Sequence, residues 1–597
     1  MSCRWTTSAG MAADLDLCVI VTTEEAESPL GGGLPVIPAG DWSPANLRGV
    51  PSGDDGTAAE AERLSALPLK IMGGSDAVIR EPAPPTGQVP RMVTVAVLGL
   101  LVVVTVVTRL HTYGEPLERD LATYAVIAHE LSDGRRLYSD LWDHKPPATH
   151  LTYAAAQTLA GVGPGSVYLL GVLPALATLL GVFWAGGTRR PGAVTGLWAA
   201  AFWTVAAGDL TLQANQPNTE VFLNACLIWA FALLAGMHGG RGDRARVTAV
   251  ALLLALATLY KPVVAVCGVF LVAAHLALPP GGATGRRRAV ADAALIVAIC
   301  GAAWLSLVGY FAMSHRLADF TGAVFAYNGF YADNLIWNLF QGLEPSNLLP
   351  GAMGSLLPLV TASLLGLTLV RWGRVPRRTG LLLALAASVL VAIAAPGKFY
   401  AHYYQLWLPV LAVGAAWALA ALDRVAGGGT RVLHAGGVLL LGVLAMVQLP
   451  SYSLPAEGWA QTKYGAIVVD TERTGRVIDR LLRPDETFYH WGSEAGLYLY
   501  SGHRPPTGVL FIEPLLEGPS AAALTRRVLA DLAREAPELV VVRSQPGATS
   551  LPAHPVVRWI LSRYRPLPEA LQPYQFLLLA RSGGALERRL NRRAPGP

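Results

Sequence analysis

Long apolar segments constrain this chain more than any other feature of its sequence. A helix needs roughly 17 to 25 apolar residues to cross the ~30 Å hydrocarbon core of a bilayer, and about eleven segments come close to this length. They are residues 92–109, 166–185, 191–208, 219–237, 246–260, 262–279, 289–313, 351–371, 379–395, 403–422 and 432–450. Only 15% of all residues are charged, and mean hydropathy is +0.41, whereas soluble domains carry about a quarter charged residues. The sequence therefore predicts a polytopic α-helical membrane protein.

One pair of these segments has two interpretations. Residues 246–260 and 262–279 are separated only by Lys261, and Pro262 opens the second segment. Because proline interrupts helical hydrogen bonding, the two segments are either separate spans or one long helix broken at Lys261–Pro262.

The arginines predict the orientation of the spans. With a cytoplasmic N-terminus, every short inside loop is basic, as the positive-inside rule requires. The outer side then contains the 110–165 loop, residues 209–220, Lys261, the 314–350 loop, residues 398–403 and everything after residue 450. We therefore expect a plasma-membrane protein with its polar loops outside the cytoplasm.

The chain divides into three parts. Residues 1–90 have a composition typical of a disordered cytoplasmic extension. Residues 91–450 hold the spans and the first outer loop, 110–165. The tail, 451–597, has the composition of a small extracytoplasmic α/β domain, because strand and helix patterns alternate in it. The predicted strands are Thr487–Trp491, Gly508–Ile512, Leu539–Arg543 and Gln575–Ala580, and the clearest helix is Ser520–Glu535.

The five cysteines suggest neither a disulfide framework nor a metal site. None lies in the predicted outer loops or the tail, and no Cys/His spacing is typical of metal binding. We expect no cofactor, and the sequence leaves a requirement for a divalent metal open.

A polar cluster in the first outer loop is the best candidate for a reaction site. A carboxylate such as Asp120 can take a proton from an attacking hydroxyl group, whereas Arg119 and Lys145 can bind a phosphate leaving group. The alternative is that Glu118–Asp120 is only a solvated helix start. The helix that follows, through Tyr124 and Leu131, is expected to be amphipathic and to lie along the membrane surface.

Other outer-side residues join this cluster, each with a structural alternative. Asn218 and Glu220 begin the 219–237 span, where they could simply cap the helix. Lys261 could reach the lipid headgroups instead of a bound phosphate. The run from Lys398 to Tyr404 could be an interfacial aromatic belt, although it also contains a lysine and His402.

These motifs together resemble a known superfamily. The resemblance rests on Arg119-Asp120 with Tyr124-Ala125, then Tyr138-x-Asp140-x-Trp142-Asp143-His144-Lys145-Pro146-Pro147, Asn218-Thr219-Glu220, Lys261-Pro262 and Phe399-Tyr400-x-His402-Tyr403. In this order they are similar to bacterial GT-C glycosyltransferases related to protein O-mannosyltransferases and aminoarabinose transferases, over roughly residues 92–450. Leu121 stands where many relatives have a second acidic residue, so Glu118 or Glu220 could assist Asp120.

The resemblance implies transfer of a sugar from a polyprenyl-phosphate carrier to a glycan, lipid or protein acceptor, with inversion. It implies that Asp120 is the base, either alone or helped by Glu118 or Glu220. Arg119, Lys145, Lys261 and His402 would bind the donor phosphate, and no nucleotide site or nucleic-acid partner is expected. The remaining substrate contacts would come from Tyr124, Asp143, His144, Asn218, Lys398, Tyr400 and Tyr403. A transporter or lipid flippase is the main alternative; a non-catalytic assembly or receptor protein is a third.

Overall fold

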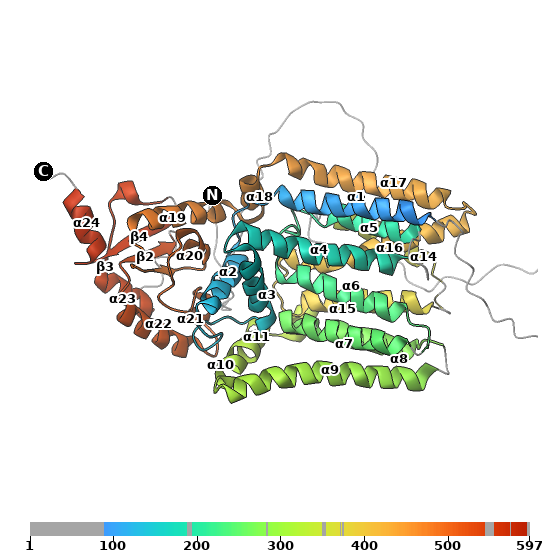
Figure 1. The fold of residues 1–597 in the computed structure, drawn as a ribbon, viewed down its shortest axis with the longest axis horizontal. Coiled ribbons are helices and arrows are strands. Elements are labelled where there is room, and N and C mark those ends of the chain that lie inside the picture. The colour runs from blue at the N-terminus through green and yellow to red at the C-terminus, as the bar shows by residue number, and fades with distance from the viewer. Residues whose placement is uncertain are drawn as a thin grey trace, which may run out of the picture. The chain divides into compact units, whose positions relative to one another are not determined.

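Each predicted apolar segment contains a helix in the computed structural model. It describes residues 89–187, 194–240, 242–281, 285–348, 354–370, 372, 375–543, 554–573 and 575–593, so the predicted N-terminal extension lies almost wholly outside it. The apolar helices are α1 (Arg91–Leu110), α4 (Pro164–Gly186), α5 (Val194–Ala206), α6 (Thr219–Ala235), α7 (Asp243–Tyr260), α8 (Ala265–Ala277), α9 (Arg286–Met313), α14 (Leu356–Thr368), α15 (Arg377–Ala394), α16 (Trp407–Val425) and α17 (Arg431–Gln448). Figure 1 shows them running side by side.

Six helical stretches of the described chain are long and apolar enough to cross a bilayer. They are Arg91–Leu110, Pro164–Gly186, Arg286–Met313, Arg377–Ala394, Ala401–Val425 and Arg431–Ser453, and four further apolar helices are shorter. The outer helices expose large apolar side chains, such as Leu100 of α1 and Leu305 of α9. Contiguous apolar surface of this kind is unfavourable in water and suits contact with lipid. The prediction of a multi-span helical membrane protein is confirmed, although the number of spans stays a prediction.

The two segments around Lys261–Pro262 form an antiparallel pair. Helix α7 ends at Tyr260, a short 3₁₀ turn (η1, Pro262–Val264) follows, and α8 returns alongside α7. Gly268 of α8 accordingly faces Leu254 of α7, and Pro280, just after α8, lies near Gly239, just before α7. A single long helix broken at Pro262 would place these residues far apart, so that alternative is excluded.

Arginines gather at one common end of the helices. Arg246 donates to the carbonyl of Gly236 at 2.7 Å, and Arg377 donates to Leu234 at 2.7 Å and to Leu278 at 2.9 Å. These carbonyls lie at or just beyond helix C-termini, where backbone oxygens lack helical partners. The arginine loops predicted to share one side of a membrane therefore do share one end of the helix bundle.

The first loop folds into two helices, α2 (Arg119–Ser132) and α3 (Pro147–Ala160). Every residue of α2 from Leu121 to Ala128 is buried. Tyr153 of α3 packs edge-on against Tyr124 of α2, with ring centroids 5.6 Å apart. The apolar residues of this helix therefore contact protein rather than lipid, and its position along a membrane surface stays a prediction.

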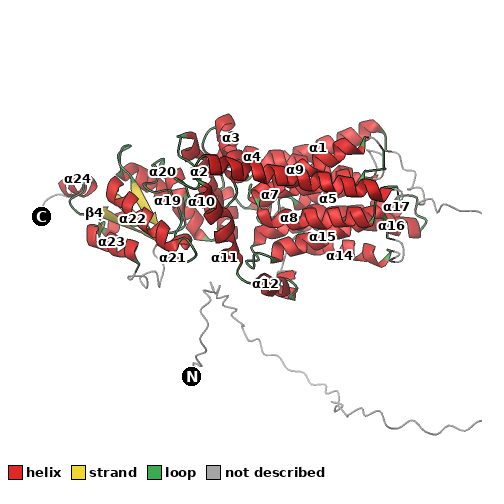
Figure 2. Ribbon diagram, turned by 90° about the horizontal axis from the view of Figure 1, so that it is seen from below, coloured by secondary structure: helices red, strands yellow, loops and turns green. Residues whose placement is uncertain are grey.

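The 314–348 loop forms short helices only. They are α10 (Leu317–Thr321), the π-helical turn η3 (Gly322–Tyr327), α11 (Asn328–Ala332), α12 (Leu335–Gln341) and α13 (Pro345–Leu348). Figure 2 shows α12 at the side of the bundle. Asn338 holds α12 to the end of α15 by donating to the carbonyl of Ala395 at 2.9 Å.

The tail contains a small mixed sheet with helices around it. Its strands are β1 (Phe488–Trp491), β2 (Leu539–Arg543), β3 (Tyr564–Pro566) and β4 (Phe576–Arg581), in the order β1-β2-β4-β3. Strands β1 and β2 are parallel, and the other two pairs are antiparallel. The helices are α18 (Ala456–Tyr464), α19 (Ala466–Leu481), α20 (Gly496–Ser501), α21 (Glu513–Leu516), α22 (Ala521–Glu535), α23 (Pro555–Arg563) and α24 (Ala585–Arg593).

The tail sequence predicted three of these strands correctly and one wrongly. Residues 508–512 do not join the sheet, because Val509 instead forms a single bridge with Trp142 of the first loop. The amide of Trp142 donates to the carbonyl of Gly508 at 2.9 Å. Strand β3 was not predicted, since three residues with two charged or proline positions carry little strand signal.

The tail and the first loop share one apolar core. Ile127 and Trp142 of the loop belong to the same buried cluster as Leu510 and Val540 of the tail. The Tyr500 hydroxyl accepts a hydrogen bond from the amide of Leu117 at 2.7 Å, just before α2. Burial of such a continuous core fixes the tail against the loop that carries the candidate site.

Candidate active site

Helix α2 begins with the acidic residues that the sequence singled out. The Glu118 carboxylate caps the helix by accepting a hydrogen bond from the amide of Asp120 at 2.8 Å. Asp120 occupies the first turn, where the positive end of the helix dipole favours a carboxylate. Glu118 therefore caps the helix, and Asp120, with 34% of its side chain exposed, is the accessible acid.

The two neighbouring carboxyl groups differ in protonation. Burial raises the pKa of Asp120, but the charges of Lys145, Arg119, His402 and His144 outweigh burial, so its pKa lies below the ordinary value. Burial and the negative charge of Asp120 raise the pKa of Glu118 to about 8. At neutral pH Asp120 is therefore an ionised carboxylate that can accept a proton, and Glu118 is mostly a neutral acid.

Asp143 organises the turn between α2 and α3. Its side chain is only 2% exposed, lies 3.1 Å from His150 Nε2, and accepts a hydrogen bond from the amide of His144 at 2.6 Å. Burial acts to raise the pKa of Asp143, but the histidine contacts and Lys145 hold it well below its usual range. Asp143 thus supports the turn from inside, and it does not face solvent.

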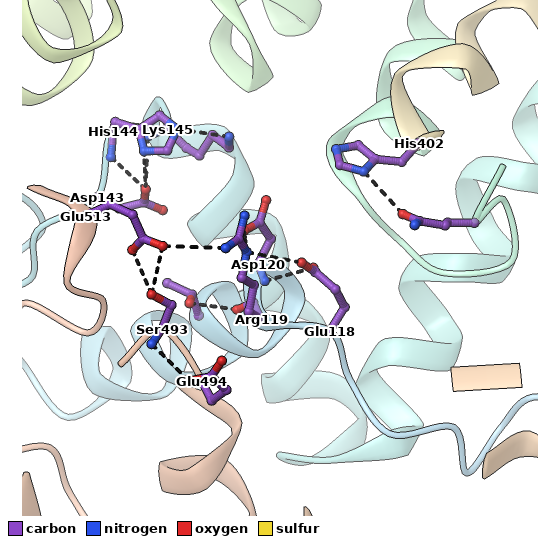
Figure 3. A network of polar contacts seen from close by, with 12 residues as sticks. Glu118, Arg119, Asp120, Asp143, His144, Lys145, His402, Ser493, Glu494 and Glu513 are labelled. Atoms are coloured by element: carbon purple, nitrogen blue, oxygen red, sulfur yellow. Dashed lines mark hydrogen bonds and ion pairs between the residues drawn. The ribbon is translucent and has the colours of Figure 1, made fainter. Parts of the chain in front are cut away.

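Lys145 follows this turn with its ammonium group near Asp120. Its Nζ lies 3.1 Å from His144 Nε2. Burial, together with the Lys145 charge, lowers the pKa of His144 to about 4, so the ring is neutral and accepts a hydrogen bond from the ammonium. Within the described part of the chain, Lys145 forms no ion pair with a carboxylate. Figure 3 shows Lys145 and His402 reaching toward Asp120 from two sides.

Glu220 and Lys261 lie next to this group as a buried ion pair. Asn218 caps α6 by accepting a hydrogen bond from the amide of Thr219 at 3.0 Å, and Glu220 follows in the first turn. The Lys261 Nζ lies 2.7 Å from Glu220 Oε1 and 3.5 Å from the centroid of the Tyr403 ring. The Lys261 ammonium therefore does not extend to the lipid headgroups, and Glu220 compensates its charge.

The aromatic run before α16 lines the same region. The His402 ring stacks on Tyr400 at 5.7 Å, meets Tyr403 edge-on at 4.8 Å, and contacts Gln213 Oε1 through Nδ1 at 3.3 Å. The Lys398 ammonium lies 4.5 Å from the centroid of the Tyr331 ring. This run is therefore more than a lipid-facing belt, because His402 and Tyr403 are tied to polar partners inside the protein.

Tyr124 differs from the other predicted substrate contacts. It is 2% exposed and packs against His150 and Tyr153, with ring centroids 5.8 Å and 5.6 Å away. Its position supports the packing of α2 on α3.

Two further sets of residues were not predicted. Ser493 and Glu513 of the tail lie beside Arg119, whose Nη1 is 3.5 Å from Glu513 Oε1. Lys463 of the tail pairs with Glu115, just before α2, and also donates to Asn215 at 2.9 Å. No local motif marks these residues, because their partners are hundreds of positions away in the sequence.

The described residues hold no group of three or more His, Cys, Asp or Glu side chains arranged to bind a metal ion. The ionised Asp120 and the ammonium group of Lys145 lie at this site. Together they suit removal of a proton from a hydroxyl and stabilisation of an anionic leaving group.

Comparison with solved structures identifies the fold. Neither a family model nor a curated protein matches this chain in sequence. The crystal structure of ArnT from Cupriavidus metallidurans in the apo state matches with a TM-score of 0.54, at 16% identity, over 81% of this chain and 97% of that chain. The chain has the fold of ArnT. The structure of ArnT bound to undecaprenyl phosphate matches with a TM-score of 0.52, at 18% identity, over 82% of this chain and 98% of that chain.

ArnT, an aminoarabinose transferase, is a GT-C glycosyltransferase. The resemblance that the motifs predicted is therefore confirmed for the fold. The match to ArnT also extends beyond residues 92–450, since it covers most of the chain.

Proposed function

We propose that this protein is a membrane glycosyltransferase that takes a sugar from a polyprenyl-phosphate-linked donor. The observation that carries the proposal is the ionised carboxylate of Asp120 beside the ammonium of Lys145, which forms no ion pair among the described residues. The fold shared with ArnT, one structure of which holds undecaprenyl phosphate, supports a lipid-linked donor.

In the proposed reaction the acceptor hydroxyl gives its proton to Asp120. The hydroxyl oxygen attacks the anomeric carbon of the sugar from the face opposite the phosphate. The new carbon–oxygen bond forms as the bond to the phosphate oxygen breaks, so the anomeric configuration inverts. The polyprenyl phosphate leaves with the electron pair, and the Lys145 ammonium stabilises its negative charge.

The surrounding residues have graded roles in this proposal. His402 lies close enough to influence Asp120 and would contact the donor phosphate. Lys261 contributes less charge to the donor, because Glu220 compensates it at 2.7 Å. We place Arg119 on the acceptor side rather than with the phosphate, since its neighbours are carboxylates.

The same proposal predicts the cellular location and orientation of the protein. The basic helix ends would face the cytoplasm, and Asp120 and the tail would lie outside the plasma membrane. The acceptor is then a glycan, lipid or protein of the cell envelope.

The direct test follows radiolabelled sugar from synthetic polyprenyl-phosphate donors into envelope acceptors. Membranes that contain the protein should transfer label from at least one hexose or pentose donor, and membranes without it should not. Equal incorporation in both, across all donors, would contradict the proposal.

A further inference from the structure

Arg119 lies among three carboxyl groups, and its contacts with all three are long. Its Nη1 is 3.5 Å from Glu513 Oε1, and its Nε is 3.6 Å from Glu118 Oε1 and 3.7 Å from Asp120 Oδ1. Charge-assisted hydrogen bonds between nitrogen and oxygen are usually about 2.7–2.9 Å long. Figure 3 shows the guanidinium between Glu513 on one side and Glu118 on the other. The contacts of the guanidinium are therefore long and weak, so its N–H groups can donate to another ligand.

Glu513 and Arg119 both keep unused hydrogen-bonding capacity. The Ser493 hydroxyl lies 2.8 Å and 2.7 Å from the two Glu513 oxygens, but a hydroxyl has one proton and donates it to one of them. A carboxylate offers about four acceptor positions and a guanidinium five donors. Both charged side chains are 46% exposed, so solvent or a ligand reaches them.

Aromatic rings lie next to these groups. Phe511 is two residues before Glu513, and its ring lies 5.6 Å from Trp142 and 6.5 Å from His144. Tyr331 stacks on the same histidine at 5.7 Å. Aromatic rings of this kind offer apolar faces beside a polar group, which suits a ligand with both C–H and O–H surfaces.

We propose that Arg119, Ser493 and Glu513 form an acceptor subsite that binds a neutral sugar through adjacent hydroxyl groups. One hydroxyl donates to the Glu513 carboxylate and a neighbouring one accepts from the Arg119 guanidinium. A phosphate in this position would face the negative charges of Glu513 and Asp120, so the subsite disfavours it. The assignment rests on the proposed function, because it places an acceptor beside Asp120.

The subsite is tested by binding, which does not require turnover. Saturation-transfer NMR would be recorded on the full-length protein in nanodiscs with methyl glycosides of glucose, mannose, galactose and arabinose, and with glucose 6-phosphate. We expect at least one methyl glycoside to bind the parent and to bind Glu513→Gln about tenfold more weakly, since a charged acceptor is lost. Ser493→Ala should weaken it less. Glu517→Gln, an exposed carboxylate four residues further on, is the matched control.

Three results would overturn the subsite. The first is that Glu513→Gln binds the methyl glycosides as tightly as Glu517→Gln does. The second is that the parent protein binds none of the methyl glycosides. The third is tighter binding of glucose 6-phosphate than of every methyl glycoside. If the first result came with a lower melting temperature of Glu513→Gln, the role of Glu513 would be structural only. Glu513-dependent binding without any sugar transfer would instead contradict the proposed function and leave the subsite standing.

Discussion

The Lys261 ammonium lies 2.7 Å from the Glu220 carboxylate, although 41 positions separate the two residues in the sequence. Glu220 is fully buried and Lys261 nearly so. Removing one partner of a buried pair leaves an uncompensated charge, whereas removing both charges is often tolerated. The pair therefore joins the start of α6 to the turn after α7, next to Asp120.

Replacement of Lys261 by methionine should reduce the free energy of unfolding by about 3–5 kcal/mol, because Glu220 would remain charged and buried. The double variant Lys261→Met/Glu220→Gln should recover most of the loss. Thermal melting of the detergent-solubilised protein measures both, with Lys398→Met as the control for loss of a lysine beside an aromatic ring. Additive losses in the double variant would show that the two charges do not stabilise one another.

Lys145 tests the assignment of the donor phosphate. Its ammonium is hydrogen-bonded to a neutral histidine 3.1 Å away, so its charge is available to an anion. Lys145→Gln should weaken donor affinity and slow departure of the phosphate, and Lys145→Arg should keep more activity than Lys145→Gln but less than the parent. Kinetics against the polyprenyl-phosphate donor separate these effects. Equal activity of the parent, Lys145→Gln and Lys145→Arg would show that the charge at position 145 has no role in transfer.

The raised pKa of Glu118 predicts how stability depends on pH. A carboxyl group whose pKa rises from 4.5 unfolded to about 8 folded binds its proton more tightly in the folded protein. Its contribution to stability is full below about pH 4.5 and is lost as the pH rises through 8. Glu118→Gln should therefore flatten the decline in melting temperature between about pH 5 and pH 9. A parent and variant with parallel profiles would show that Glu118 titrates normally.

The proposed membrane orientation rests on the arginine loops and can be tested by labelling. Single cysteines at Ser139, Asn334 and Ser520 should react with an impermeant thiol reagent in intact cells, whereas one at Gly427 should not. Permeabilised cells supply the control, since all four positions should then react. Labelling of Gly427 alone in intact cells would invert the proposed orientation.

The helical part of the fold could be predicted from the sequence, because helices in contact with lipid require long apolar runs. Uninterrupted apolar runs predicted the positions of helices such as α1 and α9, and a proline predicted the break after Tyr260. Hydropathy could not show whether α8 turns back along α7, since that depends on packing between helices. The surroundings of α2 were also missed, because an apolar stripe that faces protein is the same in sequence as one that faces lipid.

The candidate site was partly predictable for a similar reason. Asp120 and Lys145 stand out because charged residues are rare in such a chain and both lie in one short loop. Ser493 and Glu513, which lie beside Arg119, could not be identified from the sequence. Serine and glutamate are common in a tail of soluble composition, so neither residue stands out. Only the folded contact between that tail and α2 brings Glu513 to Arg119.

Sugar transfer by an amide variant of Asp120 shows whether this carboxylate is the base. Asp120→Asn keeps the shape of the side chain but cannot accept the proton, so sugar transfer from the polyprenyl-phosphate donor should fall by about 10² to 10⁴-fold. Asp133→Asn, at the exposed far end of the same helix, is the matched control and should transfer sugar like the parent. Melting temperature and donor binding should be similar for both variants. Transfer by purified Asp120→Asn at a rate close to that of the parent would contradict the account.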